Sequence, residues 1–278
     1  RPPYTDEART KEYYKAIEHV ARTLEETIRR EDPSRYTMIA FHNAPERYAA
    51  ARLTQIPMIQ GWNLYQGWYE KDITGFERIL DRLHAQYPDK VLIVTEYGAD
   101  VDPRLHSFSP EQFDFSQEYG LVYNRHYLSE MQKRPVIAGS SLWNLNAFDA
   151  EPRADGVPHV HNKGVTGLDR ELKDTYLFYK TVLNRTPQLV IGNREWQNRS
   201  GADDGSGRCT QPVPVFTNQP SVTLTVNGRK VGTKRPEQGV AMFDVPFADG
   251  ENRLVARTGA LTDVLTVGFR LAQASPER

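Results

Sequence analysis

The feature that most constrains the fold is an alternation between short, continuous apolar runs and longer segments with helical periodicity. The apolar runs are too short for helices and are bounded by turn-forming residues, so they are predicted to be buried strands. The predicted strands span residues 36–41, 57–65, 91–97 and 136–145, and the predicted helices span residues 11–30, 74–86, 110–133 and 172–183. Continuous apolar strands that alternate with helices are typical of parallel βα units.

Four such units are too few to close a barrel alone. An eightfold βα barrel uses about 250 residues, whereas the alternating region covers residues 1–187. We therefore expect the C-terminal half of a (β/α)8 TIM barrel, strands 5–8. Barrels of this kind carry their catalytic residues at the carboxyl ends of the strands, so polar side chains there are the first candidates for a functional site.

The character of the sequence changes after Pro187. Residues 188–210 are rich in Gly, Asp, Ser and Arg and show no periodicity, which predicts a linker. Residues 211–278 contain short alternating strands, and Asn227-Gly228 after one of them indicates a hairpin, because both residues tolerate positive φ. A small immunoglobulin-like β-sandwich is expected here. The predicted fold class is therefore α/β plus all-β.

Charge and composition exclude several classes of protein. The 35 Lys and Arg side chains nearly balance the 36 Asp and Glu side chains, and like charges do not form blocks, so nucleic acid is not an expected partner. The single Cys209 excludes an intramolecular disulfide. No stretch approaches the roughly 18 apolar residues of a membrane-spanning helix. The start at Arg1-Pro2-Pro3 is neither a signal peptide nor a Met-initiated start, so we expect a piece of a longer polypeptide.

One carboxylate stands out at a strand end. Glu96 follows four apolar strand residues and precedes Gly98, where the chain can turn away. A carboxylate held at a barrel mouth can attack an anomeric carbon, although a salt bridge to an Arg is an equal alternative. Polar and aromatic residues at two other strand ends could line a sugar pocket, with simple core packing as the alternative. They are Trp62, Asn63, Tyr65, Trp68, Tyr69, Trp143 and Asn144.

Several segments together resemble family-two glycoside hydrolases, which include β-galactosidases and β-glucuronidases. The resemblance lies in residues 63–69 (NLYQGWY), 95–100 (TEYGAD), 143–145 (WNL), 162–165 (NKGV), 169–170 (DR), 173–174 (KD) and 179–180 (YK). Their order and spacing agree over nearly all of residues 1–185. Residues 213–232 are similar to the accessory β-sandwich that often follows the barrel in this family.

The resemblance implies a retaining exo-glycoside hydrolase that acts on β-linked sugars. Glu96 would be its nucleophile, and Tyr65 would orient that nucleophile through a hydrogen bond. The expected substrate-binding residues are Asn63, Trp68, Tyr97, Trp143, Asn144, His161, Asn162 and Lys163.

The sequence departs from the family pattern in two places. In the family an Asn-Glu pair ends the fourth barrel strand and supplies the acid/base, but no Asn-Glu occurs here, so we expect a chain that is inactive alone. Glucuronidases of the family carry Asn, one further residue and Lys on the loop that holds the substrate carboxylate, whereas His161 stands two positions before Lys163 here. This favours a neutral sugar and hence a β-galactosidase, with β-glucuronidase or β-mannosidase as alternatives.

No other residue pattern supplies the missing carboxylic acid or a cofactor. A retaining enzyme needs two carboxyl groups about 5–5.5 Å apart, but Asp100, Asp149 and Glu151 are expected to be solvated loop charges. The histidines are scattered, with only His159 and His161 close together, so neither a metal nor a cofactor is expected.

The expected partners are a β-linked oligosaccharide or glycoside and the missing N-terminal half of the same polypeptide. A homo-oligomer is a further expectation, because half a barrel leaves open strand edges. The compartment stays open, with a periplasmic or secreted location favoured for a glycan-degrading enzyme. A non-catalytic glycan-binding or scaffold fragment is the alternative from another class.

Overall fold

The computed structural model describes residues 5–272, which form two compact units. The first comprises the chain up to Ala99 together with His126–Asn144, and the second comprises Asp100–Arg125 together with the chain from Leu145 onward. This division differs from the boundary at residue 187 expected from the sequence, because the chain leaves the first unit after Ala99 and returns to it at His126.

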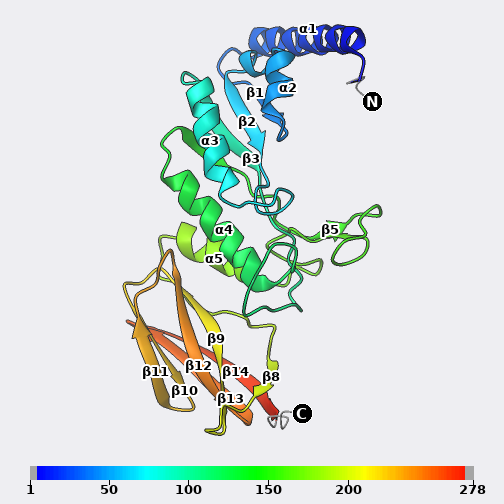
Figure 1. The fold of residues 1–278 in the computed structure, drawn as a ribbon. Helices are drawn as coiled ribbons and strands as arrows, with labels where there is room; N and C mark the ends of the chain where they lie inside the picture. The colour runs from blue at the N-terminus through cyan, green and yellow to red at the C-terminus, as the bar shows by residue number, and fades with distance from the viewer. Residues whose placement is uncertain (1–4, 273–278) are drawn as a thin grey trace. The chain divides into compact units, whose positions relative to one another are not determined.

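The first unit is built around a parallel sheet (Figure 1). Within the described residues its strands lie in the order β1-β2-β3-β4, and each neighbouring pair is parallel. Their bounds are β1 (Met38–Phe41), β2 (Ile59–Asn63), β3 (Val91–Glu96) and β4 (Ile137–Ser140). Parallel strands in chain order bring all their carboxyl ends to one edge of the sheet, and the predicted parallel arrangement is confirmed.

The helices of the first unit differ in how much they bury. Helix α3 turns four apolar side chains inward at helical spacing, Phe76, Ile79, Leu80 and Leu83. Helix α1 buries none of its residues, although its sequence is amphipathic. The helical segments are α1 (Glu7–Glu31), α2 (Pro45–Ala50), the 3₁₀ turn η1 (Leu53–Gln55), α3 (Gly75–Gln86) and the last part of α4 (Gln117–Gln132).

The helix expected from residue 110 begins only at Gln117. Phe113 and Phe115 have φ values of 68° and 57°, in the left-handed region that a right-handed helix cannot contain. The Asp114 carboxylate instead accepts hydrogen bonds from the backbone N–H groups of Glu111 and Ser116, which stabilises a loop. The expected strand 136–145 is also shorter, because β4 ends at Ser140.

The second unit contains a β-sandwich that is antiparallel except for one strand (Figure 1). In the described part of the chain one sheet has the order β11-β10-β13-β14-β8 and the other β12-β9-β7. Apolar side chains from both sheets form one core, including Val215, Phe243, Leu224 and Val267. The strands are β7 (Leu189–Ile191), β8 (Asn198–Ala202), β9 (Arg208–Thr217), β10 (Val222–Val226), β11 (Arg229–Lys234), β12 (Val240–Ala248), β13 (Gly250–Thr258) and β14 (Leu261–Ala272).

The segment expected to be a linker, residues 188–210, contributes strands to this sandwich. Strand β7 pairs with β9, and β8 pairs in parallel with β14. Arg199 in β8 is only 3% exposed. The sequence did not predict these strands because the segment is mainly polar and shows no periodicity. The strands form because they pair with β9 and β14, which lie further along the chain.

The hairpin predicted at Asn227-Gly228 is confirmed. The two residues have φ values of 50° and 77°, and they join the antiparallel strands β10 and β11 with Val226 opposite Arg229. Positive φ at both central residues matches the right-handed twist of the flanking strands.

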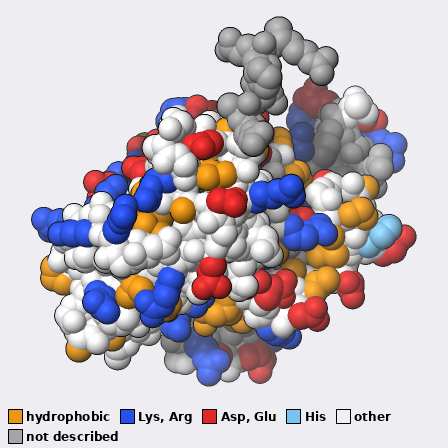
Figure 2. All heavy atoms as spheres, turned by 90° about the horizontal axis from the view of Figure 1, so that it is seen from below, with side chains coloured by type: hydrophobic (Ala, Val, Ile, Leu, Met, Phe, Trp, Pro, Cys, Tyr) orange, Lys and Arg blue, Asp and Glu red, His pale blue; other side chains and the backbone are white. Residues whose placement is uncertain are grey.

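The second unit also contains helix α5 (Asp174–Leu183) and a small ribbon of β5 (Phe148–Asp149) and β6 (Val160–His161). On the face drawn in Figure 2, acidic and basic side chains are interspersed with hydrophobic ones. None of the helices within residues 5–272 has the length and apolar character that a membrane crossing requires.

A buried carboxyl group lies at the first residue of α5. Asp174 is 3% exposed, and both its carboxylate oxygens accept hydrogen bonds from the Asn193 backbone N–H, at 2.9 and 3.0 Å. Burial raises the pKa of Asp174 from 3.8 to about 7, against the lowering effect of the Asn193 hydrogen bond, and the nearby Glu118 raises it further.

This shift predicts a pH-dependent stability. Between about pH 4 and pH 7 the folded chain keeps the Asp174 proton that the unfolded chain loses, so the contribution of Asp174 to stability is greatest below that range and is lost as pH rises. The expected slope is about 1.4 kcal/mol per pH unit. The lowered pKa of His161 acts in the opposite direction between about pH 4 and pH 6.5, so the quantity to compare is the difference in free energy of unfolding between the wild-type chain and Asp174→Asn. Urea unfolding should show this difference falling with the expected slope as pH rises, and a difference that does not change with pH would show that Asp174 does not carry the shift.

Candidate active site

Glu96 is the last residue of β3, at the carboxyl edge of the parallel sheet. Its side chain is partly exposed, whereas Val94 two residues earlier is buried. A register shift between Trp62 and Asn63 places Asn63, the last residue of β2, opposite Glu96. The Glu96 carbonyl oxygen then accepts a hydrogen bond from the Leu64 backbone N–H at 2.8 Å. The backbone of Glu96 is therefore hydrogen-bonded to the residue that follows β2.

Tyr65 contacts the carboxylate directly. Its hydroxyl donates a hydrogen bond to Glu96 Oε2 at 3.0 Å, although the two residues are 31 positions apart in the chain. The Tyr65 ring lies 5.2 Å from the ring of Tyr69, measured between centroids. A donor at this position fixes the direction of the carboxylate.

Asn63, Trp143 and Asn144 lie at the same sheet edge. The Thr95 hydroxyl donates to Asn63 Oδ1 at 2.7 Å, and the Trp143 backbone N–H donates to the Tyr97 carbonyl oxygen at 2.9 Å. The side chains of Asn63, Trp143 and Asn144 are partly exposed. The first unit therefore brings five of the predicted site residues together at the ends of β2, β3 and β4.

Trp68 and Tyr97, which were expected to bind substrate, are buried in this structure. Their exposures are 0% and 2%, so neither offers surface to a sugar in this structure. The Tyr97 ring stacks on Tyr127 with centroids 5.3 Å apart, and Tyr127 in turn stacks on Phe76. These rings form the core beneath the strand ends, which is the packing alternative for such aromatic residues.

The remaining predicted residues, His161, Asn162 and Lys163, lie in the second unit at the end of β6 and directly after it. Lys163 is 3% exposed and forms an ion pair with Asp100. The other oxygen of Asp100 accepts a hydrogen bond from the Asn162 backbone N–H at 3.1 Å. Asp100, expected to be a solvated loop charge, is thus a buried partner. Nothing in the local sequence around Asp100, four residues after Glu96, indicates that it pairs with Lys163.

Two further cations, Arg153 and Lys173, lie near this ion pair. Arg153 approaches Asp100 at 3.9 Å, and the buried Lys173 ammonium donates to Val101 O, Asn162 O and Asn162 Oδ1 at 2.7–2.9 Å. Burial, with the charges of Arg153 and Lys163, lowers the pKa of His161 from 6.5 to about 4. The imidazole of His161 is therefore neutral at pH 7 and stacks on Phe148 with centroids 4.7 Å apart.

The fold and the strand-end residues define a class of protein: a parallel βα unit that presents a hydrogen-bonded carboxylate at its carboxyl edge, in a chain that also carries a β-sandwich. The comparisons with known proteins agree. A family described as a domain of unknown function (DUF4982) matches residues 209–261. A β-glucuronidase of Bacteroides fragilis is 27% identical over 91% of this chain and 36% of its own length.

Solved structures extend the similarity. Two structures of β-glucuronidases from Bacteroides uniformis, one covalently bound to cyclophellitol-6-carboxylate aziridine, are 36% identical with a TM-score of 0.92. The match covers 97% of this chain and 33% of those chains. The chain is thus similar to β-glucuronidases, in line with the resemblance noted in its sequence, and it spans about a third of the length of these relatives.

Proposed function

We propose that this chain supplies the nucleophile of a retaining β-glycosidase and that Glu96 is that nucleophile. The observation that carries the proposal is the hydrogen bond from Tyr65 to Glu96 at the carboxyl edge of the parallel sheet. A carboxylate held in one orientation can attack an anomeric carbon and form a covalent glycosyl intermediate. The acid/base carboxyl group would come from a part of the parent polypeptide outside this chain.

The parallel sheet would then be one half of an eight-stranded barrel. An apolar hollow of about 430 Å³ lies beside β1, the edge strand of the described sheet, and is lined by side chains of α1 and β1. Val20, Leu24 and Ile28 of α1 are each about half exposed there. Such a surface favours association. The relatives are about three times as long as this chain. This supports the proposal that another part of the same polypeptide covers the apolar surface.

A β-glucuronide is the substrate class that we favour. Arg153 and Lys163 both face Asp100, and Arg153 also pairs with Asp155. Lys173 is balanced by the charges of Asp100, Glu171 and Asp102. Burial is the main reason that a proton on His161 is disfavoured, and the charges of Arg153 and Lys163 act in the same direction. These two charges would favour the carboxylate of a glucuronide. The names of the relatives support this choice. A β-galactoside is the second candidate, because His161 replaces the Asn that glucuronidases of this family carry two positions before the Lys.

The substrate class is tested by hydrolysis of p-nitrophenyl β-glucuronide and p-nitrophenyl β-galactoside. We expect the full-length parent to prefer the glucuronide in kcat/KM by at least about 100-fold. The chain of residues 1–278 alone should hydrolyse neither. A preference for the galactoside would reverse the assignment of the sugar, and hydrolysis by the chain alone would show that it holds its own acid/base.

Tyr65→Phe should lower kcat of the full-length parent by about tenfold to a hundredfold with little change in KM. The change removes one hydrogen bond to a charged group, which contributes about 1.5–3 kcal/mol. Steady-state kinetics on the preferred aryl glycoside measure the effect. Tyr87→Phe is the matched control, because the Tyr87 hydroxyl has no hydrogen-bond partner among the described residues. Equal kinetics for the two variants would remove Tyr65 from the mechanism.

A further inference from the structure

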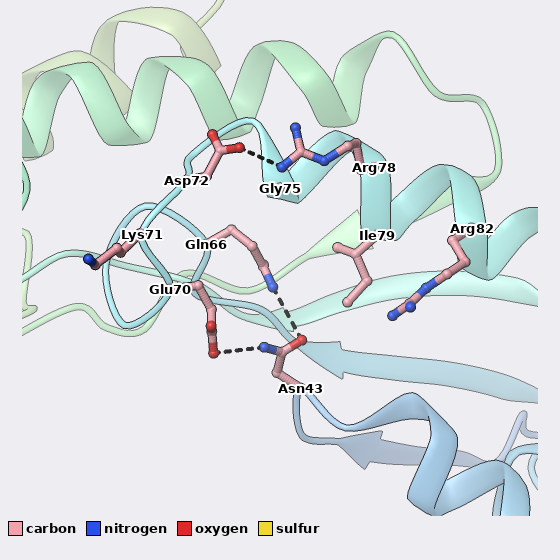
Figure 3. A pocket seen from close by; sticks show the side chains of 9 residues that line it. All are labelled: Asn43, Gln66, Glu70, Lys71, Asp72, Gly75, Arg78, Ile79 and Arg82. Atoms are coloured by element: carbon pink, nitrogen blue, oxygen red, sulfur yellow. Dashed lines mark hydrogen bonds and ion pairs between the residues drawn. The ribbon is translucent and has the colours of Figure 1, made fainter.

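A second hollow in the first unit is polar and has no part in the site described above. It has a volume of about 440 Å³, within the range of roughly 300–1,000 Å³ that small-molecule sites occupy. Figure 3 shows that it lies between the loop after β1, the loop between β2 and α3, and the first turns of α3. Asn43, Gln66 and Arg82 approach it from these three elements.

One side of the hollow is a chain of hydrogen-bonded side chains. Gln66 Nε2 donates to Asn43 Oδ1 at 3.2 Å, and Asn43 Nδ2 donates to Glu70 Oε1 at 3.0 Å (Figure 3). Gln66 is 6% exposed, and its Oε1 has no hydrogen-bond partner within the described part of the chain. A buried acceptor without a donor is costly, so a donor that reaches this oxygen would stabilise the network.

The charges around the hollow are balanced. Arg78 is paired with Asp72 at 2.5 Å, and Arg82 is paired with Glu46 on α2 at 3.0 Å. Lys71 and Glu70 supply one further charge of each sign. An anion would therefore gain little, whereas a ligand whose groups both donate and accept hydrogen bonds could satisfy Gln66 Oε1 and accept from a guanidinium.

The absence of a side chain at Gly75 keeps the hollow open beside Gln66. A Cβ at Gly75 would approach Gln66 Cγ to 3.1 Å, which is tighter than ordinary contact. Ile79, one turn further along α3, is the one apolar side chain among the lining residues and is 7% exposed. The lining therefore consists mainly of groups that donate and accept hydrogen bonds, which match the hydroxyl groups of a sugar.

We propose that this hollow binds an uncharged saccharide unit at a site distinct from Glu96. Gln66 directly follows Tyr65 in the chain. The loop whose Tyr65 hydroxyl donates a hydrogen bond to Glu96 therefore also carries Gln66 Oε1, the acceptor without a donor. The choice of a saccharide rests on the proposed function, whereas the geometry of the hollow does not. The same loop would then hold one sugar unit in the hollow while Tyr65 orients Glu96.

The test is a titration of the isotopically labelled chain with cellobiose, a neutral β-linked disaccharide, followed by NMR. The reporters are the side-chain amide signals of Asn43 and Gln66 and the backbone amide of Gly75. We expect saturable shifts of these signals, with a Kd in the millimolar range. Because no hydrolysis is measured, failure of Glu96 as the nucleophile would leave this result unchanged.

Three variants separate the proposal from its alternatives. Gln66→Met removes the open acceptor at nearly constant size and should weaken cellobiose binding by about tenfold, the equivalent of one hydrogen bond. Gly75→Ala narrows the hollow at a position where Ala is a better helix former than Gly, so this variant should fold and also bind more weakly. Gln86→Met, the same substitution at an exposed position of α3, should bind as the wild type does.

The contrary outcomes are equally specific. If cellobiose shifts none of the reporters, or shifts them equally in the wild type and Gln66→Met, the hollow is not a saccharide site. Saturable shifts with inorganic phosphate and none with cellobiose would replace the proposal with an anion site. An unchanged affinity together with a higher Tm in Gln66→Met would identify the open acceptor as a local packing defect.

Discussion

Replacing Glu96 with Gln is expected to lower kcat/KM of the full-length parent toward its preferred aryl glycoside by more than about 10⁴-fold. The amide keeps the shape of the side chain and can still accept the hydrogen bond from Tyr65, but it cannot attack an anomeric carbon. Steady-state kinetics with the p-nitrophenyl substrate measure the loss. Glu46→Gln is the control, because Glu46 is 72% exposed on α2.

Two chemical experiments would distinguish loss of the nucleophile from simple damage to the site. Glu96→Ala leaves space for azide, which should restore turnover and give a glycosyl azide of inverted configuration. Cyclophellitol-6-carboxylate aziridine, the compound covalently bound in the Bacteroides uniformis structure, should label the wild-type parent at Glu96 and leave Glu96→Gln unlabelled. Labelling of another carboxylate, or retained activity in Glu96→Gln, would show that the nucleophile lies elsewhere.

Local sequence pattern was sufficient for most of the secondary structure. Runs such as Val91–Glu96 are too apolar for an exposed strand and too short for a helix, and β3 matches the expected strand closely. The hairpin at Asn227-Gly228 follows from the backbone freedom of two residues. In both cases the local conformation depends on a few neighbouring residues, so it can be predicted without knowledge of the fold.

The errors arose where distant partners decide the structure. Strand β8 is polar in sequence, yet it pairs with β14 and buries Arg199, whose guanidinium lies 4.4 Å from the centroid of the Trp196 ring. Asp100 was expected to be solvated because carboxylates are seldom buried, and its partner Lys163 is 63 residues away. A single sequence without its contacts does not show such pairings.

The candidate site shows the same division. The position of Glu96 at a strand end followed from the local pattern, and the resemblance alone suggested its hydrogen bond to Tyr65, which the structure contains. The positions of the aromatic residues in the sequence do not distinguish exposed side chains from buried ones. Trp68 and Tyr97 pack inward, whereas Trp143 is partly exposed, because burial depends on the helices that cover each strand end.

The Asp100–Lys163 ion pair carries the second large prediction, which concerns stability. Lys163→Met should lower the free energy of unfolding by about 3–5 kcal/mol, because it leaves the Asp100 carboxylate buried without its main counter-charge. Arg153, at 3.9 Å, is too distant to replace a direct contact. Urea unfolding of the chain at pH 7 measures the change. Lys11→Met, which breaks a fully solvated pair with Glu7, is the control and should change stability by less than about 1 kcal/mol.

The double variant Asp100→Asn with Lys163→Met separates the cost of an unpaired charge from the loss of packing. The amide introduced by Asp100→Asn would be neutral and could still accept the hydrogen bond from the Asn162 backbone N–H, so more than half of the lost stability should return. If the double variant is as unstable as Lys163→Met, the lysine acts through its packed side chain and not through its charge. If Lys163→Met itself is as stable as the wild type, water or Arg153 compensates the Asp100 carboxylate in place of Lys163.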